Sequence, residues 1–313
     1  MMDPQEILAT LDEPYAPYQR EAVEAAVAQQ EAVTPFLLER LEAVVSDPEG
    51  WLAGEDRGPL LLYSLALLPH FRETRAHPHV LSLAGLPGDV AEPLLGDAIS
   101  ELLAMTLWRT SGGDSTGIQE LAQNRGAYGY GRWAAMTALA EAALLEELDA
   151  EAIRATLGEW LADDSFAARG DPAWEGLMVN LLSLHATEHD HWLRRRVREG
   201  YIAWPVRERE IDEVFNRDRD AALAEAREWA ERRFSDDVHS HLSHWASFQP
   251  GYWDEEEVPG GGFYASQDLP PLFPGEESNG GPASKPAGAD PKKKKHKRKQ
   301  QKKDRKANRK KRK

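Results

Sequence analysis

The sequence predicts an all-α fold. Between Pro17 and about Ala246, apolar residues recur three or four positions apart, the spacing that places them on one face of an α-helix. Short groups of Gly, Pro and Asp separate these segments, and no segment shows the alternation of apolar and polar residues that is typical of a half-buried β-strand. We therefore expect a series of amphipathic helices joined by short turns.

Two of the predicted helices begin at recognisable start signals. Thr34 followed by Pro35 has the pattern of an N-cap residue and a proline at the first helical position, and Asp171 followed by Pro172 repeats it. In chain order, the predicted helices cover Tyr18–Gln30, Thr34–Val45, Leu60–Leu68, Glu92–Leu107, Thr116–Asn124, Gly131–Leu145, Ala150–Ala162, Trp174–Ala186, His189–Glu199, Val206–Phe215 and Asp218–Arg233.

Taken in pairs, these helices recur at intervals of 33 to 41 residues, which is the period of HEAT-like helical hairpins. One such hairpin cannot bury both of its faces, so neighbouring hairpins stack and form a continuous core between them. The sequence therefore predicts an α-solenoid of HEAT-like hairpins, and a globular α-helical bundle is the alternative. The pairs begin near Tyr18, Pro59, Glu92, Tyr130, Asp171 and Val206.

Composition favours a folded protein of the cytoplasm. The chain has 313 residues, 41% of them apolar, which is enough for a large hydrophobic core. It contains no cysteine, which excludes disulfides, thiolate metal sites and a cysteine nucleophile. The first residues lack the basic and apolar regions of a signal peptide, and the longest apolar stretch, Leu60–Leu68, is far shorter than the ~20 residues that cross a bilayer. We expect a cytoplasmic protein without a transmembrane segment.

Three regions of the chain differ in composition. Residues 1–253 contain the predicted helices and form the expected solenoid domain. Residues 254–291 change from acidic to neutral, are rich in Pro and Gly, and are predicted to be a disordered linker. Residues 292–313 are predicted to be a disordered basic tail. Residues 1–284 contain no lysine, a bias that either a GC-rich genome or adaptation to high salt would produce.

Charge is separated between the body and the tail. Residues 292–313 hold sixteen Lys or Arg residues and one acid, whereas residues 1–291 carry a net charge of −30. So dense a positive segment cannot be buried, and without aromatic residues it would bind phosphates rather than read bases, so RNA is the favoured partner. Anionic lipid and the acidic body itself are the alternatives. The predicted nucleic-acid-binding residues are Lys292, Lys293, Lys294, Lys295, Lys297, Arg298, Lys299, Lys302, Lys303, Arg305, Lys306, Arg309, Lys310, Lys311, Arg312 and Lys313.

Several motifs resemble a known bacterial family. Pro69–Pro78 contains the pattern Phe-Arg-Glu-x-Arg-Ala-x-Pro, and it is accompanied by Tyr18–Ala22, Leu86–Asp89 and Leu95–Asp97. Over about residues 5–250 the chain resembles the bacterial family known as domain of unknown function 1186. The resemblance implies helical repeats and supplies no catalytic residue.

Many members of that family end in a SEC-C motif, which binds zinc through three Cys and a further Cys or His. This chain has Asp290–Pro291 and the basic tail at that position and no Cys, so we expect no zinc site of that kind. What the two endings would share is a basic C-terminal appendage that acts as a tether.

Histidine clusters are the main candidates for metal chemistry. His185, His189 and His191 are spaced by four and two residues, so His185 and His189 could share one face of a helix, as metal ligands do. His239, His241 and His244 form a second cluster. A zinc site needs three or four converging ligands with supporting partners, and surface histidines near helix ends are common, so we favour the structural interpretation.

Other motifs are given structural interpretations. Tyr128–Arg132 looks superficially like a phosphate loop, but it lacks the preceding strand and the Lys-Ser/Thr ending, although a helix starting at Gly131 could bind an anion with the help of Arg132. Five tryptophans on apolar stripes are assigned to contacts between helices, namely Trp108, Trp133, Trp160, Trp192 and Trp229. Three others, expected where repeats end, are candidates for an exposed surface, namely Trp204, Trp245 and Trp253.

Together these observations predict a non-catalytic interaction or scaffold protein. Its helical body is expected to bind a protein partner, and its basic tail RNA or another polyanion. No cofactor is implied by the sequence. The alternative is a metal-dependent enzyme that uses His185, His189 and His191.

Overall fold

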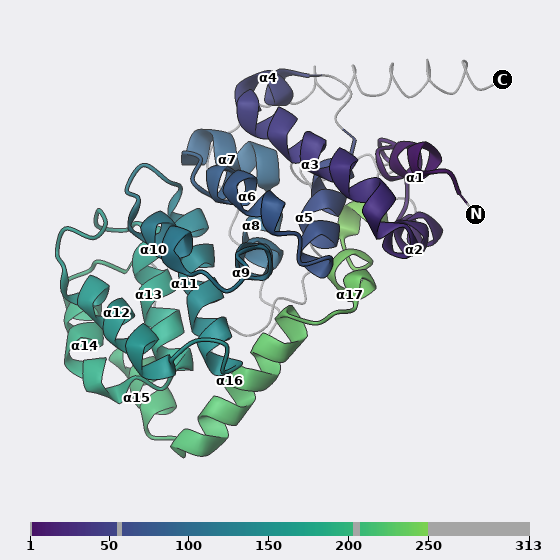
Figure 1. Ribbon diagram of the computed structural model, residues 1–313. Coiled ribbons are helices and arrows are strands. Elements are labelled where there is room, and N and C mark those ends of the chain that lie inside the picture. The colour runs from purple at the N-terminus through teal and green to yellow at the C-terminus, as the bar shows by residue number, and fades with distance from the viewer. Residues whose placement is uncertain (1, 55–57, 203–206, 250–313) are drawn as a thin grey trace. The chain divides into compact units, whose positions relative to one another are not determined.

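A computed structural model describes residues 2–54, 58–202 and 207–249 (Figure 1). Within these residues the chain is all-helical, with helices α1 to α17, three short 3-10 helices and no strand. The predicted all-α class is confirmed. None of the described helices is long and apolar enough to span a membrane. Residues 250–313, which hold the predicted linker and tail, lie outside the described residues.

The N-terminal part comprises helices α1 to α4. Asp3 starts α1 with a capping box, because its side chain accepts from the Gln5 amide at 2.9 Å while Glu6 accepts from the Asp3 amide. This helix was not among the predicted ones. The bounds are α1 Pro4–Leu11, α2 Arg20–Ala28, α3 Gln30–Ser46 and α4 Pro48–Ala53.

The predicted start at Thr34 is wrong. Helix α3 begins at Gln30, four residues earlier, and Pro35 lies inside it. The Thr34 hydroxyl donates to the Gln30 carbonyl oxygen at 2.8 Å, so it bonds back to the preceding turn instead of capping a new helix. Thr34 is buried with Val33 and Leu37, and this packing holds the first turns of α3 in place despite the proline.

Helices α5 to α9 form the next part of the chain. Residues Leu60 to Pro69 of α5 are all buried, which identifies α5 as a central helix of the core. The single helix predicted over Glu92–Leu107 is wrong, because Gly96 adopts a left-handed φ of 52° that ends α7 and the chain breaks again at Leu102. The bounds are α5 Leu60–His70, α6 His77–Ala84, α7 Gly88–Leu95, α8 Ala98–Glu101 and α9 Leu103–Thr110.

Helix α11 is the second central helix. It packs against α9, α10, α12, α13 and α16, so it joins parts of the chain that are far apart in sequence (Figure 1). The predicted cap at Asp171 is confirmed, since its side chain accepts from the Ala173 amide at 2.9 Å and Pro172 is the first residue of α13. The bounds are α10 Thr116–Gln123, α11 Gly129–Leu144, α12 Ala150–Ala162 and α13 Pro172–Ser183.

Gly131 allows α11 to approach the end of α6. A Cβ atom at this position would lie 2.2 Å from the carbonyl oxygen of Ala84, which is backbone and cannot rotate away. We expect Gly131→Ala to lower the free energy of unfolding by about 1–3 kcal/mol, despite the better helix propensity of alanine. Chemical denaturation followed by circular dichroism measures this change.

Gly117→Ala in α10 is the matched control for this substitution. Its Cβ would meet the end of the flexible Leu81 side chain, at 2.7 Å, and that side chain can move. The expected loss is smaller than for Gly131→Ala. Equal losses for the two variants would contradict the close approach of α11 to α6.

The C-terminal part of the body runs from α14 to α17. Helices α12 to α15 pack mainly on helices one or two positions away in sequence, as in a repeat array, but α17 packs on α5, far earlier in the chain (Figure 1). A repeat array with contacts only between neighbours has no such link. The bounds are α14 Asp190–Arg198, α15 Glu208–Phe215, α16 Arg219–Arg233 and α17 Val238–Leu242.

Candidate functional site

Most arginines of the body form ion pairs with carboxylates of the body. Residues 292–313, which carry the predicted nucleic-acid-binding side chains, lie outside the described residues, so the structure bears on the rest of the positive charge. Of the twenty arginines within the described residues, sixteen form ion pairs with Asp or Glu, so most of this positive charge has an opposite charge beside it. The sixteen are Arg20, Arg40, Arg72, Arg75, Arg109, Arg132, Arg154, Arg194, Arg195, Arg196, Arg198, Arg209, Arg217, Arg227, Arg232 and Arg233.

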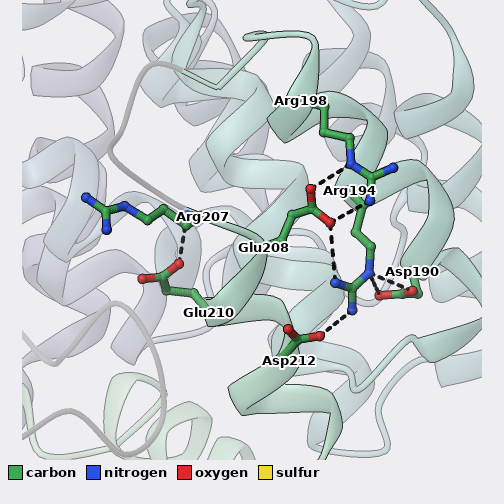
Figure 2. Close-up of polar contacts among 7 residues, drawn as sticks. All are labelled: Asp190, Arg194, Arg198, Arg207, Glu208, Glu210 and Asp212. Carbon is green, nitrogen blue, oxygen red and sulfur yellow. Dashed lines mark hydrogen bonds and ion pairs between the residues drawn. The ribbon is translucent and has the colours of Figure 1, made fainter.

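The densest of these networks ties α14 to α15 (Figure 2). Arg194 donates from Nε to both carboxylate oxygens of Asp190 at 2.9 Å and from Nη2 to Asp212 Oδ1 at 2.7 Å. Arg198, one turn later, donates from Nε and Nη2 to the two oxygens of Glu208, each at 2.6 Å. This fork geometry is the strong form of an arginine–carboxylate pair. The arginine-rich face of α14 therefore holds α15 and is not an open phosphate-binding surface.

The charge state of Glu208 is consistent with its ion pair to Arg198. Hydrogen bonds from Arg198 hold the pKa of Glu208 below its usual value, so the carboxylate stays charged near neutral pH. Beside this network, the backbone amide of Arg207 donates to Glu210 Oε2 at 2.7 Å at the start of α15 (Figure 2). The negative charge of Glu208 and Glu210 also complements the positive end of the helix dipole.

Arg196 is buried completely, with no exposed surface on its side chain. Its Nε donates to the Leu161 carbonyl oxygen at 2.8 Å and its Nη1 donates to Asp164 Oδ1 at 2.6 Å. The guanidinium lies over the rings of Trp174 and Tyr201, each 4.6 Å from the ring centroid. Arg196 thus links α14 to the end of α12 and to α13, and its role is to join helices.

The structure does not assemble a metal site from His185, His189 and His191. Helix α13 ends at Ser183, so His185 lies in a turn with a left-handed φ of 48° and does not share a helix face with His189. Its ring packs against Phe215, 5.6 Å away. Over the described ranges, no group of three or more His, Asp or Glu side chains is arranged to hold a metal ion.

The other two rings of that cluster have separate neighbours. His189 ends the 3-10 helix Thr187–His189, and its ring lies so close to Gly158 that a Cβ there would be 2.0 Å from His189 Cε1. The ring of His191 contacts Trp192. The enzyme alternative built on this cluster is therefore not supported by the geometry.

The second histidine cluster is also dispersed. His239 Nδ1 is hydrogen-bonded to the Tyr18 hydroxyl at 2.6 Å, whereas His241 Nε2 contacts the Ser235 carbonyl oxygen at 2.9 Å. His244 Nδ1 contacts the Ser240 carbonyl oxygen at 3.0 Å. Each of these three histidines therefore has a different hydrogen-bond partner.

Residues 234–248, here called the C-terminal segment, dock onto the N-terminal helices. The Tyr18 amide donates to the Phe248 carbonyl oxygen at 3.2 Å, and the rings of Tyr18, Tyr63 and Phe248 lie within 6.4 Å of one another. Burial raises the pKa of Tyr18 and raises that of Tyr63 to about 12. Both hydroxyls therefore stay protonated at neutral pH and neither is an activated nucleophile.

Arg109 of α9 also binds the C-terminal segment. Its side chain is buried, and its Nη1 and Nη2 donate to Asp236 Oδ1 and to the Phe234 carbonyl oxygen. The hydrogen bond from Arg109 lowers the pKa of Asp236, and Arg72 adds a second ion pair at 3.9 Å. This junction joins residues more than 120 positions apart and carries no local sequence signal, so the sequence pattern did not reveal it.

Two further expectations need correction. Arg132 does not help an anion site at the start of α11, because it is buried and donates to the carbonyl oxygens of Ala122 and Phe166, both at 2.9 Å. Trp245 was expected on the surface but is fully buried, since it lies in the docked C-terminal segment. Trp204 and Trp253 lie outside the described residues. Of the five tryptophans assigned to contacts between helices, Trp108 and Trp160 are buried, whereas Trp133, Trp192 and Trp229 are only partly buried.

Glu141 of α11 makes stability depend on pH. It is 9% exposed, it accepts from Arg233 Nε at 2.9 Å, and burial raises its pKa from 4.5 to about 7. The folded state therefore binds this proton more tightly than the unfolded state, and this group's contribution to stability is lost as pH rises from about 4.5 through 7. We expect the free energy of unfolding, relative to that of Glu141→Gln, to fall by about 3 kcal/mol between pH 4 and pH 8.

Urea denaturation of both proteins across this pH range measures the difference. Glu146→Gln is the control, because the Glu146 side chain is mostly exposed and pairs with Arg227 at the surface. The difference in the free energy of unfolding between Glu146→Gln and the wild type should lack the fall expected for Glu141. A flat difference for Glu141→Gln would contradict the assigned pKa.

Comparison with known proteins identifies the family of this chain. The model of the family described as protein of unknown function (DUF1186) matches residues 2–249, which is the whole helical body. The chain belongs to this family. An uncharacterised protein of Chlamydia muridarum is 30% identical over 183 residues, covering 58% of this chain and 72% of that protein, and one of Chlamydia trachomatis is 29% identical over the same shares. No solved structure matches the chain.

In this DUF1186 protein, two of the motifs that carry the family resemblance, Tyr18–Ala22 and Pro69–Pro78, contact the C-terminal segment. Tyr18, which opens the first motif, pairs with His239. Arg72, inside Pro69–Pro78, pairs with Asp236 and has a left-handed φ of 53°. The family match stops at residue 249, so residues 250–313 are additional to the matched region.

Proposed function

We propose that this protein is a non-catalytic scaffold whose helical body binds a protein partner and whose basic tail, residues 292–313, binds RNA. The observation that carries the proposal is the separation of charge. Sixteen basic residues and one acid in the tail follow a body whose net charge is −30. A cationic segment of this density attracts phosphates through release of their counterions, without base-specific contacts.

Ion pairing within the body supports the assignment of RNA binding to the tail. Sixteen of the twenty described arginines are paired with carboxylates, and three of them, Arg109, Arg132 and Arg196, are buried. Residues 1–284 contain no lysine. The body would therefore repel a polyanion, and the tail supplies the attraction.

The acidic surface of the body supports a different partner for that part of the chain. Acidic side chains are exposed on the body, for example Glu31, Glu39 and Glu42 of α3. Such a surface suits a protein with basic residues at its interface, because complementary charge accelerates association and disfavours wrong partners. A bifunctional tether of this kind would bring the partner to RNA.

A pull-down with and without nuclease tests the two parts of this proposal separately. We expect full-length protein to recover RNA-dependent material that nuclease removes, and a second set of proteins that survives nuclease treatment. The comparison protein ends at Asp290 and should retain only the second set. Recovery of the same RNA by both proteins would contradict the tail as the binding element, and loss of every protein after nuclease would contradict a direct protein partner.

A further inference from the structure

Three aromatic side chains form a row at the start of α11. Tyr128 is the N-cap residue, Tyr130 lies in the first turn and Trp133 in the next. The rings of Tyr130 and Trp133 are stacked, with centroids 5.8 Å apart and planes 13° apart, and Tyr128 meets Tyr130 edge to face at 5.3 Å. We call Tyr128, Tyr130 and Trp133 the aromatic row.

Two glycines allow the backbones of other helices to pack closely against the aromatic row. A Cβ at Gly88, the first residue of α7, would lie 2.6 Å from Tyr128 Cδ2, and a Cβ at Gly176 of α13 would lie 2.8 Å from Trp133 Cγ. The Tyr128 amide also donates to the Leu86 carbonyl oxygen at 2.9 Å. The backbones of α7 and α13 thus approach the rings closely, so the row is preorganised, which lowers the entropy cost of binding.

Tyr130 is the exposed member of the aromatic row, whereas Tyr128 and Trp133 are partly buried and pack against the core. Tyr130 is 42% exposed, the largest exposed fraction of any large hydrophobic residue within the described part of the chain. Burial raises the pKa of Tyr130, and the negative charges of Glu175 and Glu92 raise it further. Burial and Glu92 likewise raise the pKa of Tyr128 to about 12. Of these two carboxylates, Glu92 of α7 is exposed at the surface, whereas Glu175 of α13 is buried.

Several aromatic side chains elsewhere in the described body have an arginine over the ring. Arg40 lies 4.8 Å from the centroid of Trp51, and Arg169 lies 4.3 Å from that of Tyr201. Trp192 and Trp229 have Arg195 and Arg232 at 4.9 and 4.3 Å. Among the described residues, no arginine lies over a ring of the aromatic row.

We infer that the aromatic row, with the exposed Glu92, is a docking site for a basic peptide segment of the protein partner, whose Arg or Lys side chain lies against Tyr130. The ring supplies a cation–π contact and Glu92 supplies opposite charge. Tyrosine and tryptophan are also enriched where partners bury the most surface. The inference rests on the proposed function, because it names where the body binds its partner and which chemistry it recognises.

Binding of a labelled hexa-arginine peptide to full-length, RNA-free protein at 150 mM salt tests the site, with a hexa-citrulline peptide as the neutral control. We expect Tyr130→Leu to weaken hexa-arginine binding by about 3- to 30-fold, because it removes the ring but keeps an apolar side chain. Tyr130→Phe should bind as the wild type does. Glu92→Gln should weaken binding as well, and hexa-citrulline should bind poorly to every variant.

Phe36→Leu is the matched control, because Phe36 is 38% exposed and lies among glutamates on α3. It should bind hexa-arginine as tightly as the wild type. Unchanged binding by Tyr130→Leu, or an equal loss in Phe36→Leu, would overturn the site and leave a diffuse attraction to the acidic surface. Circular dichroism confirms that each variant is folded.

The nuclease-treated pull-down separates this inference from the proposed function. If wild type and Tyr130→Leu recover the same proteins, the partner exists but binds elsewhere, and the docking site is wrong. If neither recovers any protein, the proposed protein-binding role itself fails. Selective loss of proteins from Tyr130→Leu, together with the peptide result, supports both.

Discussion

Replacing all sixteen basic residues of the tail with glutamine is expected to lower the affinity of the full-length protein for RNA by about 10³-fold or more. Each basic residue that neutralises a phosphate releases a counterion, and this release supplies most of the binding free energy of a segment that reads no bases. The body cannot replace the lost contacts, because its arginines are largely paired with its own carboxylates. Fluorescence anisotropy with a labelled single-stranded RNA measures the affinity.

Salt dependence makes the same prediction quantitative. For single strands, the logarithm of the binding constant falls with the logarithm of salt concentration by about 0.7 for each neutralised phosphate. The wild-type protein should therefore show a slope of several units and the glutamine variant a slope near zero. A tail with the same sixteen residues in scrambled order is the matched control and should bind unchanged. Equal slopes for the wild type and the glutamine variant would contradict the proposed role of the tail.

Arg196→Ala is expected to lower the free energy of unfolding by about 3–5 kcal/mol, the largest loss of stability expected for a single substitution in the body. The Arg196 side chain is fully buried, so its removal leaves a cavity beside the rings of Trp174 and Tyr201. It also leaves the Leu161 carbonyl oxygen without its donor. Urea denaturation followed by circular dichroism measures the loss.

Arg195→Ala is the control beside it in sequence. Its side chain is 42% exposed and pairs with Glu199 at the surface, so we expect a loss below about 1 kcal/mol. Arg196→Met should recover part of the stability, because it fills the space while Asp164, which is largely exposed, returns to water. Similar losses for Arg195→Ala and Arg196→Ala would show that the buried Arg196 contributes no more to stability than an exposed arginine of the same helix.

Helix positions were predictable wherever the signal was local. Ala150–Ala162 was predicted with the bounds that the structure has, and Asp171 with Pro172 marked the start of α13. Apolar spacing and caps act within one or two turns, so they are visible in a short stretch of sequence. The predicted helix start at Thr34 was wrong because a threonine hydroxyl can also donate to a carbonyl oxygen of the preceding turn. Only the residues that pack around it decide which hydrogen bond forms.

The candidate sites were harder to predict, because they depend on which residues meet in space. His185 and His189 have suitable spacing for a shared helix face, but the end of α13 at Ser183 separates them. Arg132 looked available at a helix start and is instead buried against Phe166. Spacing along the chain cannot reveal these outcomes, since each depends on the direction in which the side chain leaves the folded helix.

Local sequence was sufficient for the all-α class, most helix positions and the separation of charge between body and tail, because periodicity and composition are properties of neighbouring residues. Only the folded chain decided that the C-terminal segment docks on Tyr18 and Arg109, that Trp245 is buried and that the arginines of α14 are occupied. These contacts join residues far apart in sequence. Their partners are selected by packing and by the burial of charge, and no short stretch of sequence encodes either.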